Sequence, residues 1–100
     1  NVNVYKKNRE ILLEELPKAG FTTFSPPDGA FYFYVDISKF SNDSLSFCKR
    51  VLDEVGVAIT PGLDFDQNRG SNTIRFSYAR STEDIIEGAK RIKKFMSSYN

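Results

Sequence analysis

The stretch Phe31-Tyr32-Phe33-Tyr34-Val35-Asp36-Ile37 decides the fold, because it is the densest run of aromatic and β-branched residues in the chain. Aromatic side chains occupy both alternating sets of positions in this run. A strand with apolar residues on both sides is typical of the middle of a sheet. We therefore expect residues 31–37 to form a central strand that is covered on both faces.

Shorter strands are expected around this central one. Phe21-Thr22-Thr23-Phe24 precedes it, and the breaker Ser25-Pro26-Pro27-Asp28-Gly29 separates the two. Val57-Ala58-Ile59-Thr60 predicts a short buried strand that Pro61-Gly62 ends. After a polar loop, Thr73-Ile74-Arg75-Phe76-Ser77-Tyr78-Ala79 predicts a further strand. The sheet should thus contain about four strands.

Three segments repeat apolar residues at helical spacing. The first, 4–16, must end between Pro17, which lacks a backbone donor, and Gly20. The second follows the capping sequence 41–44 and ends at Gly56, and the third opens on the capping-box residues Ser81 and Asp84. The expected buried stripes are Tyr5, Leu12 and Leu16; Leu45, Cys48, Val51, Leu52 and Val55; and Ile85, Ala89, Ile92 and Met96.

The predicted order is helix, strand, strand, helix, strand, strand, helix. This order favours an α+β fold in which a small, mainly antiparallel sheet carries helices packed on it. With 100 residues, the chain is expected to form a single domain over residues 1–100. Because it begins with Asn1, we expect it to be part of a longer protein.

Composition excludes several classes of function. The net charge of +1 gives no field that would gather a polyanion, and no apolar run is long enough to cross a membrane. The chain has no histidine and one cysteine, so an internal disulfide, a zinc finger and histidine-based acid–base chemistry are ruled out. We expect no nucleic-acid or membrane partner, no metal site and a cytoplasmic location.

Arg75 is the most informative residue, because it lies inside an apolar strand where a charge is costly without a partner. The pattern alone leaves two interpretations open. Arg75 is either a solvated surface charge or internal ion-pair partner, or it is a planar fork that binds a ligand carboxylate by two hydrogen bonds. Pro61-Gly62 likewise either ends a strand or allows close approach of the backbone to a ligand or domain.

Other chemistry-bearing residues have simpler explanations. Lys39 follows a strand at a polar corner, which is unlike the apolar pocket of a Schiff-base lysine. Asp64 and Asp66 have no third oxygen ligand at a fixed spacing, so they are interpreted as polar loop residues. Cys48 falls on the apolar stripe of its helix and is interpreted as a small buried hydrophobe.

Four separated motifs resemble a known family over essentially the whole chain. They are Pro27-Asp28-Gly29-Ala30-Phe31-Tyr32, Gly56-Val57-Ala58-Ile59-Thr60-Pro61-Gly62, Asp64-Phe65 and Ile74-Arg75-Phe76-Ser77-Tyr78-Ala79. Together they are similar to the C-terminal small domain of fold-type I, pyridoxal-phosphate-dependent aminotransferases of class I/II, the group that includes aspartate aminotransferase. One departure is Asp66, which follows Phe65 where many relatives have glycine.

The resemblance implies a role for one residue. The family's strand arginine corresponds to Arg75, which would bind the α-carboxylate of the amino-acid or 2-oxo-acid substrate. The loop at Gly29-Ala30 and the turn at Pro61-Gly62 would lie toward the large domain, and the small domain would close over bound substrate. Pyridoxal 5'-phosphate would be held by the large domain, because its binding motifs are missing from this chain. No residue here is therefore assigned a catalytic, cofactor-binding or metal-binding role.

The expected whole enzyme transfers an amino group between an amino acid and a 2-oxo acid, usually as a homodimer, and the isolated chain should be inactive. Three alternatives stay open. They are a pyridoxal-phosphate-dependent lyase on the same scaffold, a stand-alone RNA-binding module that stacks bases on strand aromatics, and an amino-acid-sensing domain that uses Arg75. The sequence does not decide which amino acid is the substrate.

Overall fold

The helices and strands follow one another in the order that the sequence predicts. The computed structural model describes residues 2–24, 31–64, 68 and 70–99. Its elements are α1 (Val2–Lys18), β1 (Thr22–Phe24), β2 (Tyr32–Asp36), α2 (Ser44–Val55), β3 (Thr60–Pro61), the 3-10 turns η1 (Gly62–Asp64) and η2 (Gly70–Asn72), β4 (Thr73–Ser77) and α3 (Thr82–Ser97). In these described ranges, no helix has the length and apolar character needed to cross a membrane.

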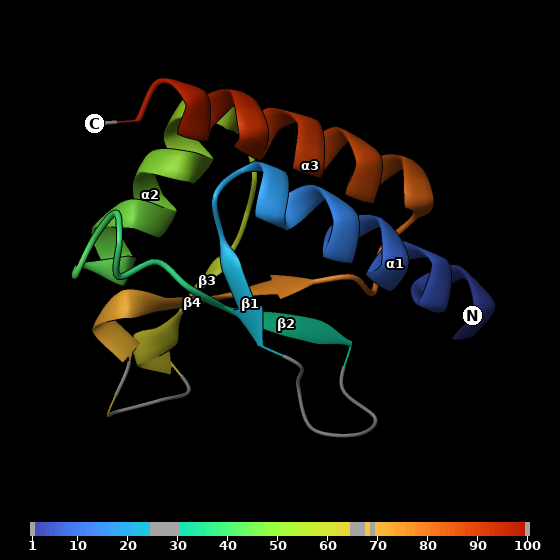
Figure 1. The fold of residues 1–100 in the computed structure, drawn as a ribbon, viewed down its shortest axis with the longest axis horizontal. Helices are drawn as coiled ribbons and strands as arrows, with labels where there is room; N and C mark the ends of the chain where they lie inside the picture. Colours follow the sequence, from blue (N-terminus) through green and yellow to red (C-terminus); the bar gives the residue numbers. More distant parts are fainter. Residues whose placement is uncertain (1, 25–30, 65–67, 69, 100) are drawn as a thin grey trace.

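The strands form one antiparallel sheet in the order β1-β2-β4-β3 (Figure 1). Three strands have three to five residues, and β3 has only two. In the β2–β4 pair, Phe33 lies opposite Phe76 and Tyr34 lies opposite Arg75. The α+β class, the small antiparallel sheet and the central position of β2 are thus confirmed.

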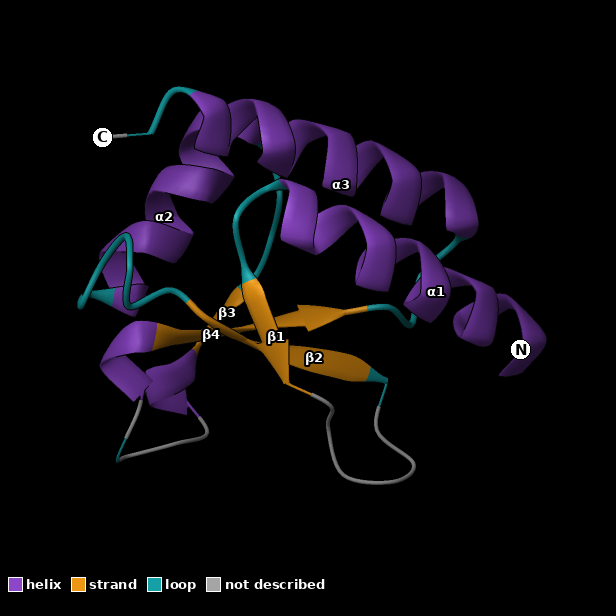
Figure 2. Ribbon diagram, viewed as in Figure 1, coloured by secondary structure: helices purple, strands orange, loops and turns teal. Residues whose placement is uncertain are grey.

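All three helices lie on the same side of the sheet (Figure 2). Phe33 and Val35 of β2 are fully buried beneath them, whereas Tyr32 and Tyr34 point to the opposite side and are only half-buried. Within the part of the chain that the structure describes, the expectation that β2 is covered on both faces is therefore wrong. Tyrosine explains the error, because its ring packs like an apolar residue while its hydroxyl remains compatible with a polar surface.

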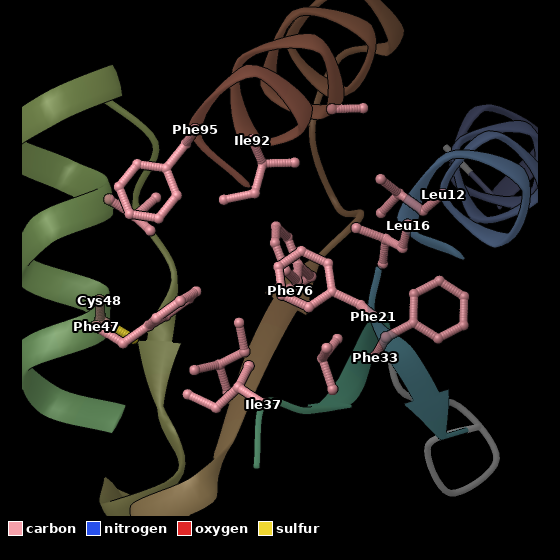
Figure 3. Close-up of a cluster of buried hydrophobic side chains, with 14 of the residues drawn as sticks. Leu12, Leu16, Phe21, Phe33, Ile37, Phe47, Cys48, Phe76, Ile92 and Phe95 are labelled. Atoms are coloured by element: carbon pink, nitrogen blue, oxygen red, sulfur yellow. The ribbon is translucent and has the colours of Figure 1, made fainter. Parts of the chain in front are cut away.

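The core fills the space between the helices and the covered face of the sheet (Figure 3). Each fully buried aliphatic or aromatic side chain stabilises the fold by about 1.5–3 kcal/mol relative to exposure, so this layer supplies most of the favourable free energy. The largest members with less than 2% exposure are Leu16, Phe33, Val35, Ile37, Phe47, Val51, Ile74 and Ile92.

Two predicted helical stripes differ from the structure in part. Cys48 and Val51 of α2 and Ile85, Ala89 and Ile92 of α3 are buried as predicted, but other positions are not. In α2, Phe47 is buried at 1% exposure, while Leu45 and Leu52 are 61% and 51% exposed. Phe47 packs edge-on against the rings of Phe21 and Phe95, and this large aromatic contact sets the rotation of the helix. In α3, Phe95 takes the core position that was predicted for Met96, which is half-buried.

The predicted strand at 57–60 was also misplaced. Residues 57–59 lie outside the sheet, and pairing with β4 begins only at Thr60 and Pro61. Helix boundaries were predicted more accurately. Asp43 caps α2 by accepting from the backbone N–H of Ser46, Gly56 ends α2 with a left-handed φ of 71°, and α1 ends at Lys18.

Candidate functional site

Arg75 lies in the middle of β4, on the face of the sheet that the helices leave uncovered. Its neighbours across the sheet are Tyr34 of β2 and Thr60 of β3. The flanking residues Ile74 and Phe76 point into the core, so strand alternation places Arg75 on the opposite side, where it is half-buried. The charge of Arg75 is therefore kept out of the apolar core.

The guanidinium of Arg75 lies over the ring of Tyr32, with 4.7 Å between its Cζ atom and the ring centroid. Tyr32 faces Ser77 directly, and Arg75 is its diagonal neighbour on β4. Diagonal neighbours on one face of a sheet are within reach of aromatic and long side chains. The stack therefore follows directly from the strand register.

Tyr34 completes an aromatic pair beside the arginine. The rings of Tyr32 and Tyr34 meet edge to face, with centroids 5.3 Å apart at 78°. Their hydroxyl oxygens are 3.2 Å apart, so one hydroxyl donates a hydrogen bond to the other. Arg75, Tyr32 and Tyr34 thus form one cluster on the helix-free face, which we call the arginine–tyrosine cluster.

The Pro61-Gly62 turn lies next to this cluster, because Pro61 pairs with Ile74 one position along β4 from Arg75. A Cβ atom on Gly62 would lie 2.1 Å from the side-chain oxygen of Thr73 and 2.6 Å from its carbonyl oxygen. A Cβ on Gly70 would lie 2.8 Å from the backbone of Leu63. Both glycines are required by close backbone packing, which holds η1 and η2 against β4.

This arrangement is suited to binding a carboxylate. An arginine fork binds the two oxygens of a carboxylate through parallel hydrogen bonds, and it keeps its charge at every physiological pH. A cation–π contact such as the one with Tyr32 attracts the guanidinium through its charge and does not itself use an N–H group.

The remaining predicted residues do not join the cluster. Gly29 and Ala30 of the first loop motif, like Phe65 and Asp66 of the third, lie outside the described residues. Asp64 and Lys39 are exposed. Cys48 is buried, and this burial, together with the charge of Asp64, raises the pKa of its thiol to about 12, so Cys48 is a poor nucleophile.

A separate groove of about 290 Å³ lies where residues 56–58 approach α3. Leu12 and Phe76 line its floor, and Arg80, Asp84 and Arg91 are among the residues around it. Arg91 is engaged within the fold, because its Nε atom is 2.9 Å from Glu87 and its Nη1 atom donates to the carbonyl of Val55 at 3.2 Å. The groove does not include Arg75.

The sequence reasoning found Arg75 but gave Tyr32 and Tyr34 no role beside it. Both tyrosines belong to the predicted central strand 31–37, and the only binding role open to them there was among the strand aromatics of an RNA-binding module. The available signal was their spacing of two, which puts both on one face of a strand. This spacing alone could not show that Arg75 lies beside the tyrosines, because that depends on the register between β2 and β4.

Comparison with known proteins places this geometry in a family. Residues 1–92 match the family model for aminotransferase class I and II. The chain is 45% identical over 98 residues to valine–pyruvate aminotransferase of Mycobacterium tuberculosis, covering 98% of the chain and 25% of that protein. It is 36% identical over 99 residues to aspartate aminotransferase of Sulfurisphaera tokodaii, covering 95% of the chain and 25% of the relative.

A solved structure agrees with these matches. The crystal structure of a candidate aminotransferase from Silicibacter pomeroyi superposes with a TM-score of 0.92 and is 57% identical, covering 98% of this chain and 26% of the other. The fold and the sequence relatives thus agree on one class of protein, the aminotransferases. The chain belongs to the aminotransferase class I and II family. It spans about a quarter of the length of the curated relatives that it matches.

Proposed function

We propose that this chain is the substrate-binding small domain of a pyridoxal-phosphate-dependent aminotransferase, in which Arg75 binds the α-carboxylate of the substrate. The observation that carries the proposal is the position of Arg75 on the helix-free face of the sheet, stacked on Tyr32 and bordered by the tight Pro61-Gly62 turn. The whole enzyme would transfer an amino group between an amino acid and a 2-oxo acid. Family membership favours this interpretation over the RNA-binding and amino-acid-sensing modules.

The proposed role of Arg75 is to fix the orientation of the substrate. Two parallel hydrogen bonds define the plane of the carboxylate, and this plane limits the directions that the bonds of the α-carbon can take. Orientation of this kind lowers the entropic part of the barrier, because the reacting groups no longer have to find one another. Closure of the small domain over substrate would exclude water and strengthen the charge interaction with Arg75.

Pyridoxal phosphate, when bound, supplies an electron sink for bonds at the α-carbon. The lysines of this chain, all of which lie among the described residues, do not fit the task of holding it. A lysine that attacks a carbonyl is activated by desolvation, yet every lysine here is exposed except Lys93, which is half-buried and pairs with Glu15. We therefore assign cofactor binding to the rest of the full-length protein, and we expect the isolated chain to be inactive.

We further propose that the full-length protein is a homodimer, as is usual for this family, and that it is cytoplasmic. Its substrate side chain is not assigned. The relatives are named for valine with pyruvate and for aspartate, so an assay should span aliphatic and acidic amino acids.

The direct test is Arg75→Lys in the full-length enzyme, assayed with a panel that includes L-valine and L-aspartate and with pyruvate or 2-oxoglutarate as acceptor. Lysine keeps the charge but not the fork, so kcat/KM should fall roughly ten- to a hundredfold. Arg80→Lys is the matched control, because Arg80 is exposed and lies beyond the end of β4. Unchanged kcat/KM in Arg75→Lys would remove Arg75 from the role, and turnover without an acceptor would indicate a lyase.

A further inference from the structure

We propose that Tyr32 is the positioning residue that orients the Arg75 fork for its carboxylate, and that Tyr34 holds Tyr32 in place. This inference rests on the proposed function, in which Arg75 binds the substrate carboxylate, and it adds Tyr32 as the residue that positions Arg75. The inference is based on the contact between Arg75 and Tyr32, in which the guanidinium carbon lies 4.7 Å from the ring centroid.

An arginine side chain has several rotatable bonds, so binding a carboxylate costs conformational entropy unless the fork is already oriented. The ring of Tyr32 reduces this cost before substrate arrives, because cation–π attraction favours one position of the guanidinium. The attraction depends on the ring and the charge, so the hydroxyl of Tyr32 is not needed for it. A phenylalanine at this position should therefore orient Arg75 nearly as well.

Tyr34 fixes the ring that does the orienting. It lies directly opposite Arg75 on β2 and meets Tyr32 edge to face. The hydroxyl pair at 3.2 Å ties the outer ends of the two rings, while the strand ties their inner ends. The ring of Tyr32 is thus restrained mainly by its edge-to-face contact with Tyr34 and by the strand, and the hydroxyl pair is an additional contact.

The partner that this cluster selects is a carboxylate in particular, and a neutral amide of the same shape should gain little from it. A carboxylate accepts two charge-assisted hydrogen bonds from the fork, whereas an amide offers one acceptor oxygen without a charge. Loss of the Tyr32 ring should reduce the preference for the carboxylate over the amide. General damage to the domain would instead weaken the binding of both compounds.

The test measures Kd by isothermal titration calorimetry for 3-methylbutanoate and 3-methylbutanamide on the full-length holoenzyme. The preference is the ratio of the amide Kd to the carboxylate Kd. In Tyr32→Leu it should fall roughly three- to thirtyfold, the range that a cation–π contact supports. Tyr32→Phe keeps the ring and should retain the preference within about twofold, because the cation–π contact needs only the ring and its charge partner. Tyr32→Ile is a second ring-free variant with good strand propensity, in case Tyr32→Leu does not fold.

Arg75→Leu separates this inference from the proposed function. If Arg75 binds the carboxylate, Arg75→Leu abolishes the preference, and adding Tyr32→Leu to it causes no further loss, since both residues act through one fork. A preference that is lost in Arg75→Leu but unchanged in both ring-free variants would overturn the role of Tyr32 alone. A preference that survives Arg75→Leu would overturn the proposed function and this inference together.

Discussion

The side-chain amide of Asn8 joins α1 to the chain just beyond β4, because its Nδ2 atom donates to the carbonyl oxygen of Arg80 at 2.6 Å. It also donates to the carbonyl of Tyr78 at 3.1 Å, and its oxygen accepts from the hydroxyl of Thr82 at 2.8 Å. Asn8 is fully buried, so these bonds satisfy a polar group that would otherwise be costly to bury. The contact fixes the end of the strand that carries Arg75.

Asn8→Ala should therefore destabilise the domain by about 2–3 kcal/mol, because it leaves the buried carbonyl oxygen of Tyr78 and the partly buried one of Arg80 without their donor. We expect hydrogen exchange to speed up in α1 and at the start of α3 in the full-length protein. Asn42→Ala is the matched control, because Asn42 is exposed. Equal exchange in the two variants would show that Asn8 does not tie these helices together.

The ion pairs of Glu15 predict a pH dependence. Hydrogen bonds from Lys93 of α3 and then from Lys18 hold the pKa of Glu15 below its ordinary value of 4.5. A lowered folded-state pKa gives stability that is present above pH 4.5 and is lost as the pH falls through the lower value. Glu15→Gln should thus lower the Tm at pH 7. At a pH below the folded-state pKa of Glu15, where the carboxyl is protonated, the same substitution should have little effect on the Tm. Glu14→Gln, at the exposed neighbour of Lys18, should change the Tm little at either pH.

Two glycines should respond in opposite directions to the same substitution. Gly62→Ala forces a Cβ within 2.1 Å of the side-chain oxygen of Thr73, so we expect a loss of about 1–3 kcal/mol and a lower kcat/KM as β3 shifts beside Arg75. Gly88→Ala, in α3, places its Cβ where no atom lies within 4 Å and should stabilise the protein by about 0.5–1 kcal/mol. Thermal unfolding of both full-length variants checks the signs, and a neutral Gly62→Ala would contradict the packing described.

Cys48 should resist alkylation. Its folded-state pKa of about 12 leaves almost no thiolate at pH 8, so iodoacetamide should label the peptide containing Cys48 far more slowly in the native protein than after unfolding. Because the unfolded thiol ionises near its ordinary value of 9.0 and the folded thiol does not, stability should fall as the pH rises above 9. Cys48→Ala should weaken that fall, and rapid native labelling would show that the thiol is not buried.

The element order could be predicted from the sequence, because its signals are local. Pro17, Gly20, Asp43 and Gly56 act on the backbone within one turn, and the helices end where they indicate. The partners of individual side chains were harder to predict from the sequence, because they depend on tertiary contacts. Phe47 turns α2 toward Phe95, which lies in another helix, and no periodicity within α2 reveals that contact.

The candidate site likewise combines a feature that local sequence reveals with contacts that depend on the tertiary structure. Arg75 stood out because a charge within an apolar strand is unusual, and this is a property of one segment. Its stack on Tyr32 depends on the register between β2 and β4, which are joined through α2, β3 and two 3-10 turns. Asn8 was missed because a polar residue in an apolar stripe gives no local sign that its partners lie 70 and 72 residues away.

The central claim, that Arg75 binds the substrate α-carboxylate, is tested most directly by a crystal structure of the full-length enzyme with a bound 2-oxo acid. We predict that both carboxylate oxygens lie about 2.7–2.9 Å from two guanidinium nitrogens of Arg75, while its Cζ atom remains over Tyr32. A carboxylate held by other residues, with Arg75 directed away from it, would contradict the claim.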